Sequence, residues 1–178
     1  MSDPKPKKTK AVMVRVPDLL MTLAENYIGK QYASRPDFIV EAIRLYIYDI
    51  SLIEERIIEA LKNEDVLDAA KVEFYHERLN KLLDDDRTFY KESEKRSSEE
   101  PVGVLLSIMP GLIEEMDSMV GRTKAFKNNP EFIKMAISHL LALLLNREVI
   151  SLNAKKFLPT ADKKIVKEDL DKLRKKIV

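Results

Sequence analysis

Residues 11–17 read A-V-M-V-R-V-P and residues 104–110 read V-L-L-S-I-M-P, two short apolar runs that each end at a proline. Each run precedes apolar residues at helical spacing and then a second helix start, which reads S-R-P-D-F-I-V-E-A-I-R from Ser34 and N-N-P-E-F-I-K-M-A-I-S from Asn128. The two prolines are 93 positions apart, whereas Phe38 and Phe132 are 94 apart, which indicates one extra residue in the second turn. The chain therefore contains a duplicated strand-helix-helix unit.

One such unit is too small to fold alone, because a single strand with two helices cannot pair its backbone groups or cover its apolar face. The chain has 178 residues, of which 45% are hydrophobic and only four are glycine, a composition typical of a helix-rich protein with a core. We therefore expect a mainly α-helical fold with short β-strands, in which the two units share one core.

The order of elements in both copies resembles that of the ribbon-helix-helix family of DNA-binding proteins. In that family two units intertwine, and their strands pair into an antiparallel ribbon that enters the major groove. A two-stranded ribbon fits this groove and presents alternate side chains to the base edges. The resemblance covers the two repeats, and it implies that double-stranded DNA is the partner.

The first strand alternates between two faces, because successive side chains of a strand point to opposite sides. Its three valines form an apolar face that should rest on the helices. Ala11, Met13 and Arg15 form the other face, which the resemblance directs toward the groove. Arg15 can bind guanine through two hydrogen bonds, whereas Ala11 and Met13 can only touch a thymine methyl group.

The second strand differs at the aligned positions, which are Val104, Leu106 and Ile108. Three large aliphatic side chains facing solvent would read DNA poorly, so they are candidates for a protein-partner or oligomer surface. The alternative is a strand that is buried on both sides.

Each second helix begins with a capping side chain followed three positions later by a carboxylate, as in Ser34 with Asp37. In the family this helix start binds a DNA phosphate, so the resemblance makes Ser34 and Arg35 phosphate-binding candidates. Ahead of the first strand, residues 1–10 contain four lysines and no apolar anchor. Lys8 and Lys10 lie nearest the strand, and we expect this flexible arm to contact phosphates.

Between the copies the apolar spacing predicts two helices that are separated near residues 63–65. This hairpin has three possible roles: a spacer, a dimerisation arm, or a lid over the second strand. The expected boundaries follow. They are 1–10 for the arm, 11–50 for the first unit, 51–92 for the connector, 93–101 for a polar linker, 102–147 for the second unit and 148–178 for a charged C-terminal helix.

The net charge of +1 hides an uneven distribution along the chain. Residues 1–50 carry a net +2, residues 51–100 a net −6 and residues 101–178 a net +5, so the acidic charge lies in the connector. The chain has no cysteine, and its two histidines, His76 and His139, lie in different predicted helices. We therefore expect no enzyme activity, no metal and no cofactor, and with no membrane segment in view we expect a cytoplasmic protein.

These features favour sequence-specific binding of double-stranded DNA by a transcriptional repressor that reads the major groove with its first unit. The alternatives are a protein-interaction or architectural module, and an antitoxin that covers a toxin with its helices. The strands can pair within one chain or between equivalent copies of two chains. High effective concentration favours the first pairing and symmetry favours the second, and we expect a homodimer.

Overall fold

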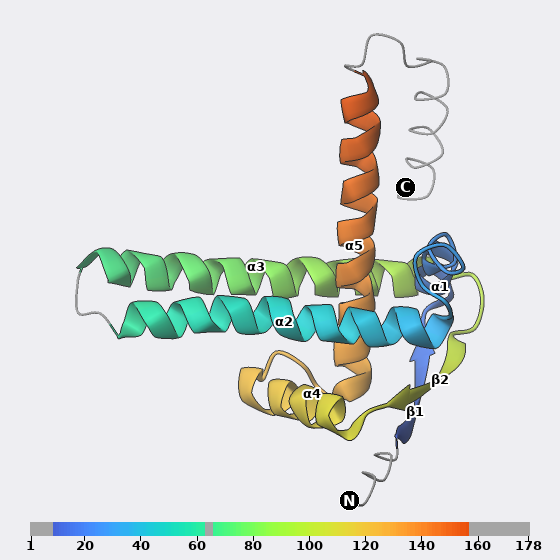
Figure 1. The fold of residues 1–178 in the computed structure, drawn as a ribbon, viewed down its shortest axis with the longest axis horizontal. Helices are drawn as coiled ribbons and strands as arrows, with labels where there is room; N and C mark the ends of the chain where they lie inside the picture. Colours follow the sequence, from blue (N-terminus) through green and yellow to red (C-terminus); the bar gives the residue numbers. More distant parts are fainter. Residues whose placement is uncertain (1–8, 63–65, 157–178) are drawn as a thin grey trace, which may run out of the picture. The chain divides into compact units, whose positions relative to one another are not determined.

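The structure, a computed structural model, describes residues 9–62 and 66–156. Within these residues the chain is mainly helical, as expected, with one short two-stranded sheet (Figure 1). Each strand is followed by a shorter helix and then a longer one. The elements are β1 (Lys10–Val16), α1 (Asp18–Ala24), α2 (Arg35–Leu61), α3 (Val66–Arg96), β2 (Val102–Ile108), α4 (Pro110–Thr123) and α5 (Asn129–Lys156).

β1 and β2 pair with each other in antiparallel orientation, and they form a two-stranded ribbon within one chain. In this register Met13 lies opposite Leu105, and Arg15 lies opposite Gly103. Of the two pairings that the sequence left open, the structure has the internal one. A covalent connection holds the two strands at high effective concentration, which favours this pairing over one between chains. Homodimer formation remains a prediction.

The two faces of β1 differ as the alternation predicts. Val14 and Val16 are buried, and Val12 is half-buried on the same side. The residues of the opposite face are exposed, and they are Ala11, Met13 and Arg15. The predicted orientation of the first strand is therefore confirmed.

For β2 the predicted orientation is wrong. Val104, Leu106 and Ile108 are only 5%, 0% and 1% exposed, so they belong to the core and form no solvent-facing partner surface. The alternative of a strand buried on both sides is also wrong, because Leu105 and Ser107 are exposed. The faces exchanged because alignment on the two prolines misplaced the strand by one residue, and a one-residue shift turns every side chain to the other face.

The helix starts show where this shift arises. Pro17 is the N-cap of α1, whereas the N-cap of α4 is Met109 and Pro110 is already inside the helix. The equivalent strand ends Val16 and Ile108 are therefore 92 positions apart. The caps Ser34 and Asn128 are 94 apart, so the second copy has two extra residues before its long helix, not one.

The two copies share one core, as expected. Phe38 of α2 and Phe132 of α5 are both fully buried. The ring of Tyr46 in α2 lies 5.3 Å from that of Phe132 and 6.0 Å from that of Phe126, measured between centroids. Aromatic contacts at these distances join the first copy to the second across the core.

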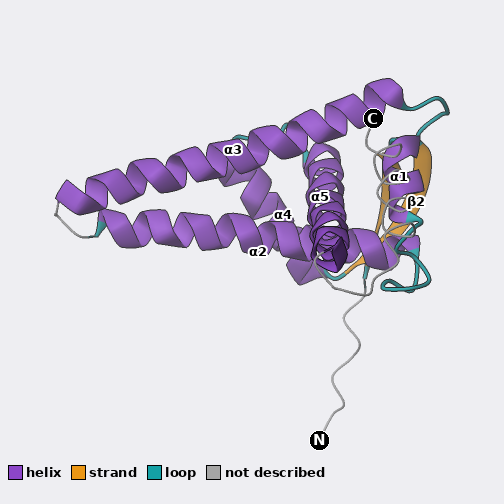
Figure 2. Cartoon of the chain, turned by 90° about the horizontal axis from the view of Figure 1, so that it is seen from above, coloured by secondary structure: helices purple, strands orange, loops and turns teal. Residues whose placement is uncertain are grey.

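The connector is a hairpin of two long helices, as predicted, with α2 ending at Leu61 and α3 beginning at Val66. The helices lie close together at their shared tip and separate toward the ribbon (Figure 2). α3 continues to Arg96, four residues into the segment that we expected to be a linker. Beyond it the hydroxyl of Ser97 accepts a hydrogen bond from the Leu19 backbone at 3.2 Å, which connects the end of α3 to α1.

The chain divides into two compact units, and the boundary lies inside α5. The ribbon, the first four helices and the start of α5 up to Leu140 belong to the first unit, and the second unit begins at Leu141. α5 continues to Lys156 without a break at residue 147, where we expected the second repeat to end. The rest of the predicted C-terminal helix, residues 157–178, lies outside the described residues, as does Lys8 of the arm.

Candidate nucleic-acid interface

The exposed outer face of the ribbon is the surface that the resemblance assigns to DNA. At its centre Met13 and Leu105 lie opposite each other, and they are 60% and 58% exposed. Exposed apolar side chains of this size on a short ribbon are available for contact with another molecule. From one end of the ribbon to the other, the outer pairs are Ala11 with Ser107, Met13 with Leu105, and Arg15 with Gly103.

Arg15 is the only charged side chain among these six. It is exposed, and within the described part of the chain its guanidinium has no ion-pair or hydrogen-bond partner. Its cross-strand neighbour Gly103 has no side chain, and a Cβ placed there would come 3.7 Å from the sulfur of Met13. The guanidinium therefore keeps all five donors for a ligand.

The start of α2 is less suited to phosphate than the resemblance implies. The Asp37 backbone N–H donates to the Ser34 hydroxyl at 3.3 Å, and that hydroxyl donates to the Asp37 carboxylate at 2.6 Å. Pro36 has no N–H to offer. The Arg35 guanidinium donates to Glu25 at 2.6 Å, so the cation is already paired. The predicted cap is confirmed, while the acidic Asp37 stands where a phosphate would bind.

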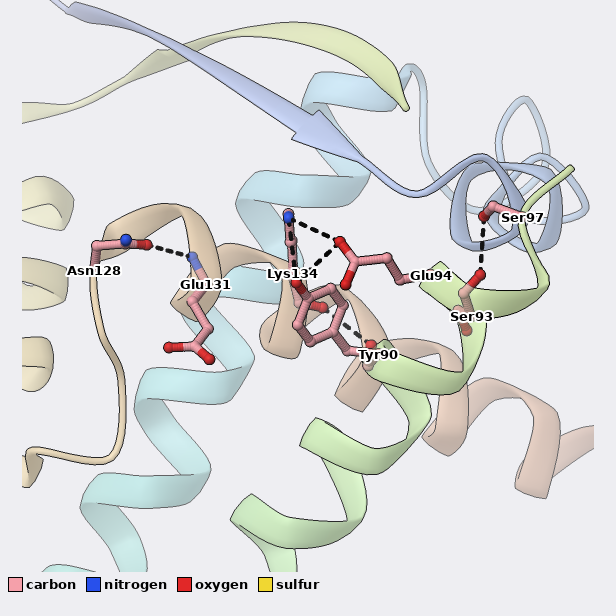
Figure 3. A network of polar contacts seen from close by, with 8 residues as sticks. Tyr90, Ser93, Glu94, Ser97, Asn128, Glu131 and Lys134 are labelled. Carbon is pink, nitrogen blue, oxygen red and sulfur yellow. Dashed lines mark hydrogen bonds and ion pairs between the residues drawn. The ribbon is translucent and has the colours of Figure 1, made fainter. Parts of the chain in front are cut away.

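The start of α5 is arranged in the same way. The Asn128 side-chain oxygen accepts the Glu131 N–H at 3.0 Å, as Figure 3 shows, and the Glu131 carboxylate accepts the Lys127 N–H at 2.6 Å. Asn129 donates to Asp117 at 2.5 Å. Both capped helix starts are thus confirmed as local structure, and both bring a carboxylate to the helix end.

A shallow hollow of about 740 Å³ lies beside one end of the ribbon. Leu105 and Ser107 line it from β2, and Asp37, Glu41 and Arg44 line it from α2. Arg44 forms an ion pair with Glu41 at 3.6 Å, so its charge is partly offset. The hollow lies at the Ser107 end of the ribbon, away from Arg15, which makes the two ends electrostatically different.

A buried polar cluster joins the three helices α2, α3 and α5. His139 of α5 contacts the Asp49 carboxylate of α2 through Nε2 at 2.8 Å, and the Asp86 carboxylate of α3 through Nδ1 at 3.1 Å. His139 is 8% exposed and Asp86 is 4% exposed. Both ring nitrogens can donate to carboxylates only when the imidazole is protonated.

Burial shifts the ionisation of this cluster. Burial by itself lowers the pKa of His139, but the hydrogen bonds and charges of Asp86 and Asp49 outweigh it, so the pKa lies above its ordinary value. Burial raises the pKa of Asp86, and the contact with His139 reverses only part of that rise. Among the described residues the nearby buried Tyr46 hydroxyl has no partner in hydrogen-bonding geometry, and burial together with the Asp86 charge raises its pKa. The cluster has the character of a structural clamp, and none of its residues lines the hollow beside the ribbon.

A second polar group fastens α5 to α3 (Figure 3). The Lys134 ammonium donates to the Tyr90 hydroxyl at 3.3 Å, lies 3.7 Å from the Glu94 carboxylate and sits 5.0 Å from the Tyr90 ring centroid. Tyr90 donates to Glu94 at 3.3 Å. These contacts hold α3 and α5 together, and they pair the Lys134 ammonium with groups of the protein itself.

Sequence reasoning missed the outward-facing residues of β2 and the clamp around His139. The outward-facing residues of β2 were readable from the sequence. Four aliphatic residues at even positions from Val102 to Ile108 alternate with Gly103, Leu105 and Ser107. That alternation predicts the buried face better than the proline does. The clamp around His139 had no signal in the sequence, because Asp49, Asp86 and His139 lie far apart in sequence and meet only through tertiary packing.

When compared with known proteins, the chain matches no family model, no curated protein and no solved structure. Among the described residues, no group of three or more histidine or acidic side chains is arranged to hold a metal ion. None of the described helices is long and apolar enough to cross a membrane. The case for a function therefore rests on the ribbon and its surroundings.

Proposed function

We propose that this chain binds double-stranded DNA by placing the outer face of the β1–β2 ribbon in the major groove, as a sequence-specific regulator that acts as a repressor. The observation that carries the proposal is the unpaired Arg15 on the exposed face of a two-stranded antiparallel ribbon. A ribbon of this width enters the major groove, and an arginine there binds the O6 and N7 atoms of guanine through two hydrogen bonds.

The charges near the ribbon are few, which shapes the expected binding. Lys10 is exposed at the start of β1, and the sequence before it contributes Lys5, Lys7 and Lys8. These cations supply the salt-sensitive part of the affinity, because each phosphate contact releases counterions. Arg35 adds less than the resemblance implies, since Glu25 already holds it.

The test is selection of bound sequences from a random duplex pool, with the intact chain and an Arg15→Ala variant compared at two salt concentrations. We expect an enriched motif containing guanine, and a loss of roughly 5- to 150-fold in affinity for that motif when Arg15 is replaced, as one bidentate base contact provides. Arg56→Ala is the matched control, because Arg56 is also exposed but lies near the far end of α2, paired with Glu59. It should bind like the intact chain.

The other outcomes identify the alternatives. Salt-sensitive binding without a motif contradicts specific readout and indicates an architectural role. Absence of binding contradicts the proposal and favours a protein partner, including a toxin, that docks on the exposed Met13 and Leu105.

A further inference from the structure

Resting on the proposed function, we infer that a single chain reads an asymmetric DNA site, with a guanine at one end, A·T pairs at the centre and no specific contact at the other end. A ribbon made from equivalent strands of two chains would present the same side chains twice and read a palindrome. The internal pairing removes that requirement, because β1 and β2 have different sequences.

The ribbon has an approximate internal twofold that allows its two halves to be compared. Residues 92 positions apart are equivalent, since β1 and β2 begin and end with that separation. Met13 corresponds to Leu105, and Arg15 corresponds to Ser107. The centre of the outer face is therefore nearly symmetric in chemistry, whereas its two ends are not.

The Arg15 end can select a base and the Ser107 end cannot do so strongly. Arginine offers a rigid fork of donors that matches guanine, whereas a serine hydroxyl both donates and accepts and so accommodates more than one base. The cross-strand neighbours Gly103 and Ala11 have no polar side-chain atoms. The Ser107 end also borders the hollow that contains Asp37 and Glu41, whose charges oppose a close approach of phosphate.

The centre favours A·T pairs for a separate reason. Met13 and Leu105 offer no hydrogen bond, so they complement the methyl group of thymine, which is the apolar feature of the major groove. Against a G·C pair they would desolvate polar base edges without replacing the lost hydrogen bonds, and that is unfavourable.

The length of the ribbon sets the size of the site. The outer positions of each strand are separated by four residue steps from first to last, which is roughly 13 Å at the rise of a β-strand. With one base pair about every 3.4 Å of duplex, this corresponds to roughly four base pairs. The expected core motif is a guanine at one end, A·T pairs about two pairs away and no preference at the fourth pair.

The experiment uses the full chain, and it combines sequence selection with the mass of the protein–DNA complex. The inference predicts a non-palindromic motif of this kind and one chain per site, and a homodimer would carry two complete ribbons and bind two such sites. Ser107→Ala should leave the motif unchanged. Ser107→Gln should add an adenine preference about four pairs from the guanine, because glutamine forms two hydrogen bonds with adenine. Glutamine is neutral, so it forms no ion pair with Asp37 or Glu41.

Two kinds of failure are distinguishable. A palindromic motif with two chains per site, a G·C-rich centre, or a Ser107→Gln motif identical to that of the intact chain overturns the inference while the DNA-binding proposal stands. No binding by the intact chain overturns both.

Discussion

At the scale of single residues, His139 is the buried polar side chain that contacts carboxylates on two neighbouring helices. It lies between the Asp49 carboxylate of α2 and the Asp86 carboxylate of α3, and Asp86 is almost completely buried. Removing one partner from a buried ionic cluster leaves the other group without compensation. His139→Ala should therefore lower the free energy of unfolding by roughly 3 kcal/mol, measured by urea denaturation near pH 6.

The sequence supplies a matched control for this change in the second histidine. His76 is exposed on α3, so His76→Ala should change the free energy of unfolding by less than about 0.5 kcal/mol. Equal losses in the two variants, or no loss in His139→Ala, would show that the cluster does not hold the helices together.

The same cluster predicts that stability depends on pH. In the unfolded chain His139 returns to its ordinary pKa of about 6.5, whereas in the folded chain its pKa is higher. The folded state therefore keeps this proton longer, so the stabilisation is complete below about pH 6.5 and is lost as the pH rises through the folded pKa. The raised pKa of Asp86 acts in the same direction, because its proton is also held more tightly in the folded state.

Urea denaturation of the intact chain and of His139→Ala across pH 6 to 10 measures this effect. The difference in stability between them should become smaller as the pH rises. A difference that stays constant, or that grows toward high pH, would contradict a protonated His139 in the clamp.

At the scale of the elements, the sequence predicted more of the pattern than of its register. The alternation in residues 11–16, the caps Ser34 and Asn128 and the two connector helices are local features, and each was readable from spacing and residue type. The register of β2 was also readable from the alternation of Val102 to Ile108, but Pro110 was taken as equivalent to Pro17, although Pro110 lies inside a helix and Pro17 caps one. The ion pair of Arg35 with Glu25 depends on the conformation of the turn between α1 and α2, so the spacing of the two residues in the sequence does not predict it.

Two neighbouring leucines of β2 test the corrected register directly. Leu106 is 0% exposed, and Leu105 is 58% exposed. Leu106→Ala should lower the free energy of unfolding by about 2–5 kcal/mol, because it leaves a cavity in the core. Leu105→Ala should change it by less than about 0.5 kcal/mol.

These two variants share one chemistry and differ only in the face that they occupy, so thermal or urea unfolding of both gives a clear answer. If Leu105 proved the more sensitive, the strand would have the orientation that we first expected from the prolines.

At the scale of the whole molecule, the two copies of the strand-helix-helix pattern contribute different side chains to the ribbon and the core. The first supplies the exposed Arg15, and the second supplies the exposed Leu105, the buried inner face of β2 and the His139 side of the clamp. This division is possible because the strands pair within the chain, so the copies need not remain self-complementary. The acidic charge of residues 51–100 lies in the helical connector, apart from the ribbon face that we assign to DNA.

Internal pairing can be tested covalently, because the chain has no cysteine of its own. Ala11 and Ser107 are cross-strand partners on the exposed face. Paired residues of an antiparallel ribbon have Cα atoms about 4.5–5.5 Å apart, a separation that a disulfide spans. The double variant Ala11→Cys, Ser107→Cys should therefore oxidise to a monomer that migrates faster on a non-reducing gel, whereas either single variant should not.

The crosslink would also stabilise the fold, because it closes a loop of nearly one hundred residues in the unfolded chain. The entropic contribution reaches about 4.7 kcal/mol for a loop of that length, and strain in the folded state reduces it. Urea denaturation with and without reductant measures the gain. A covalent dimer from the double variant would show that β1 pairs with β2 of another chain, and in that case two chains would build each ribbon and the site on DNA would need two of them.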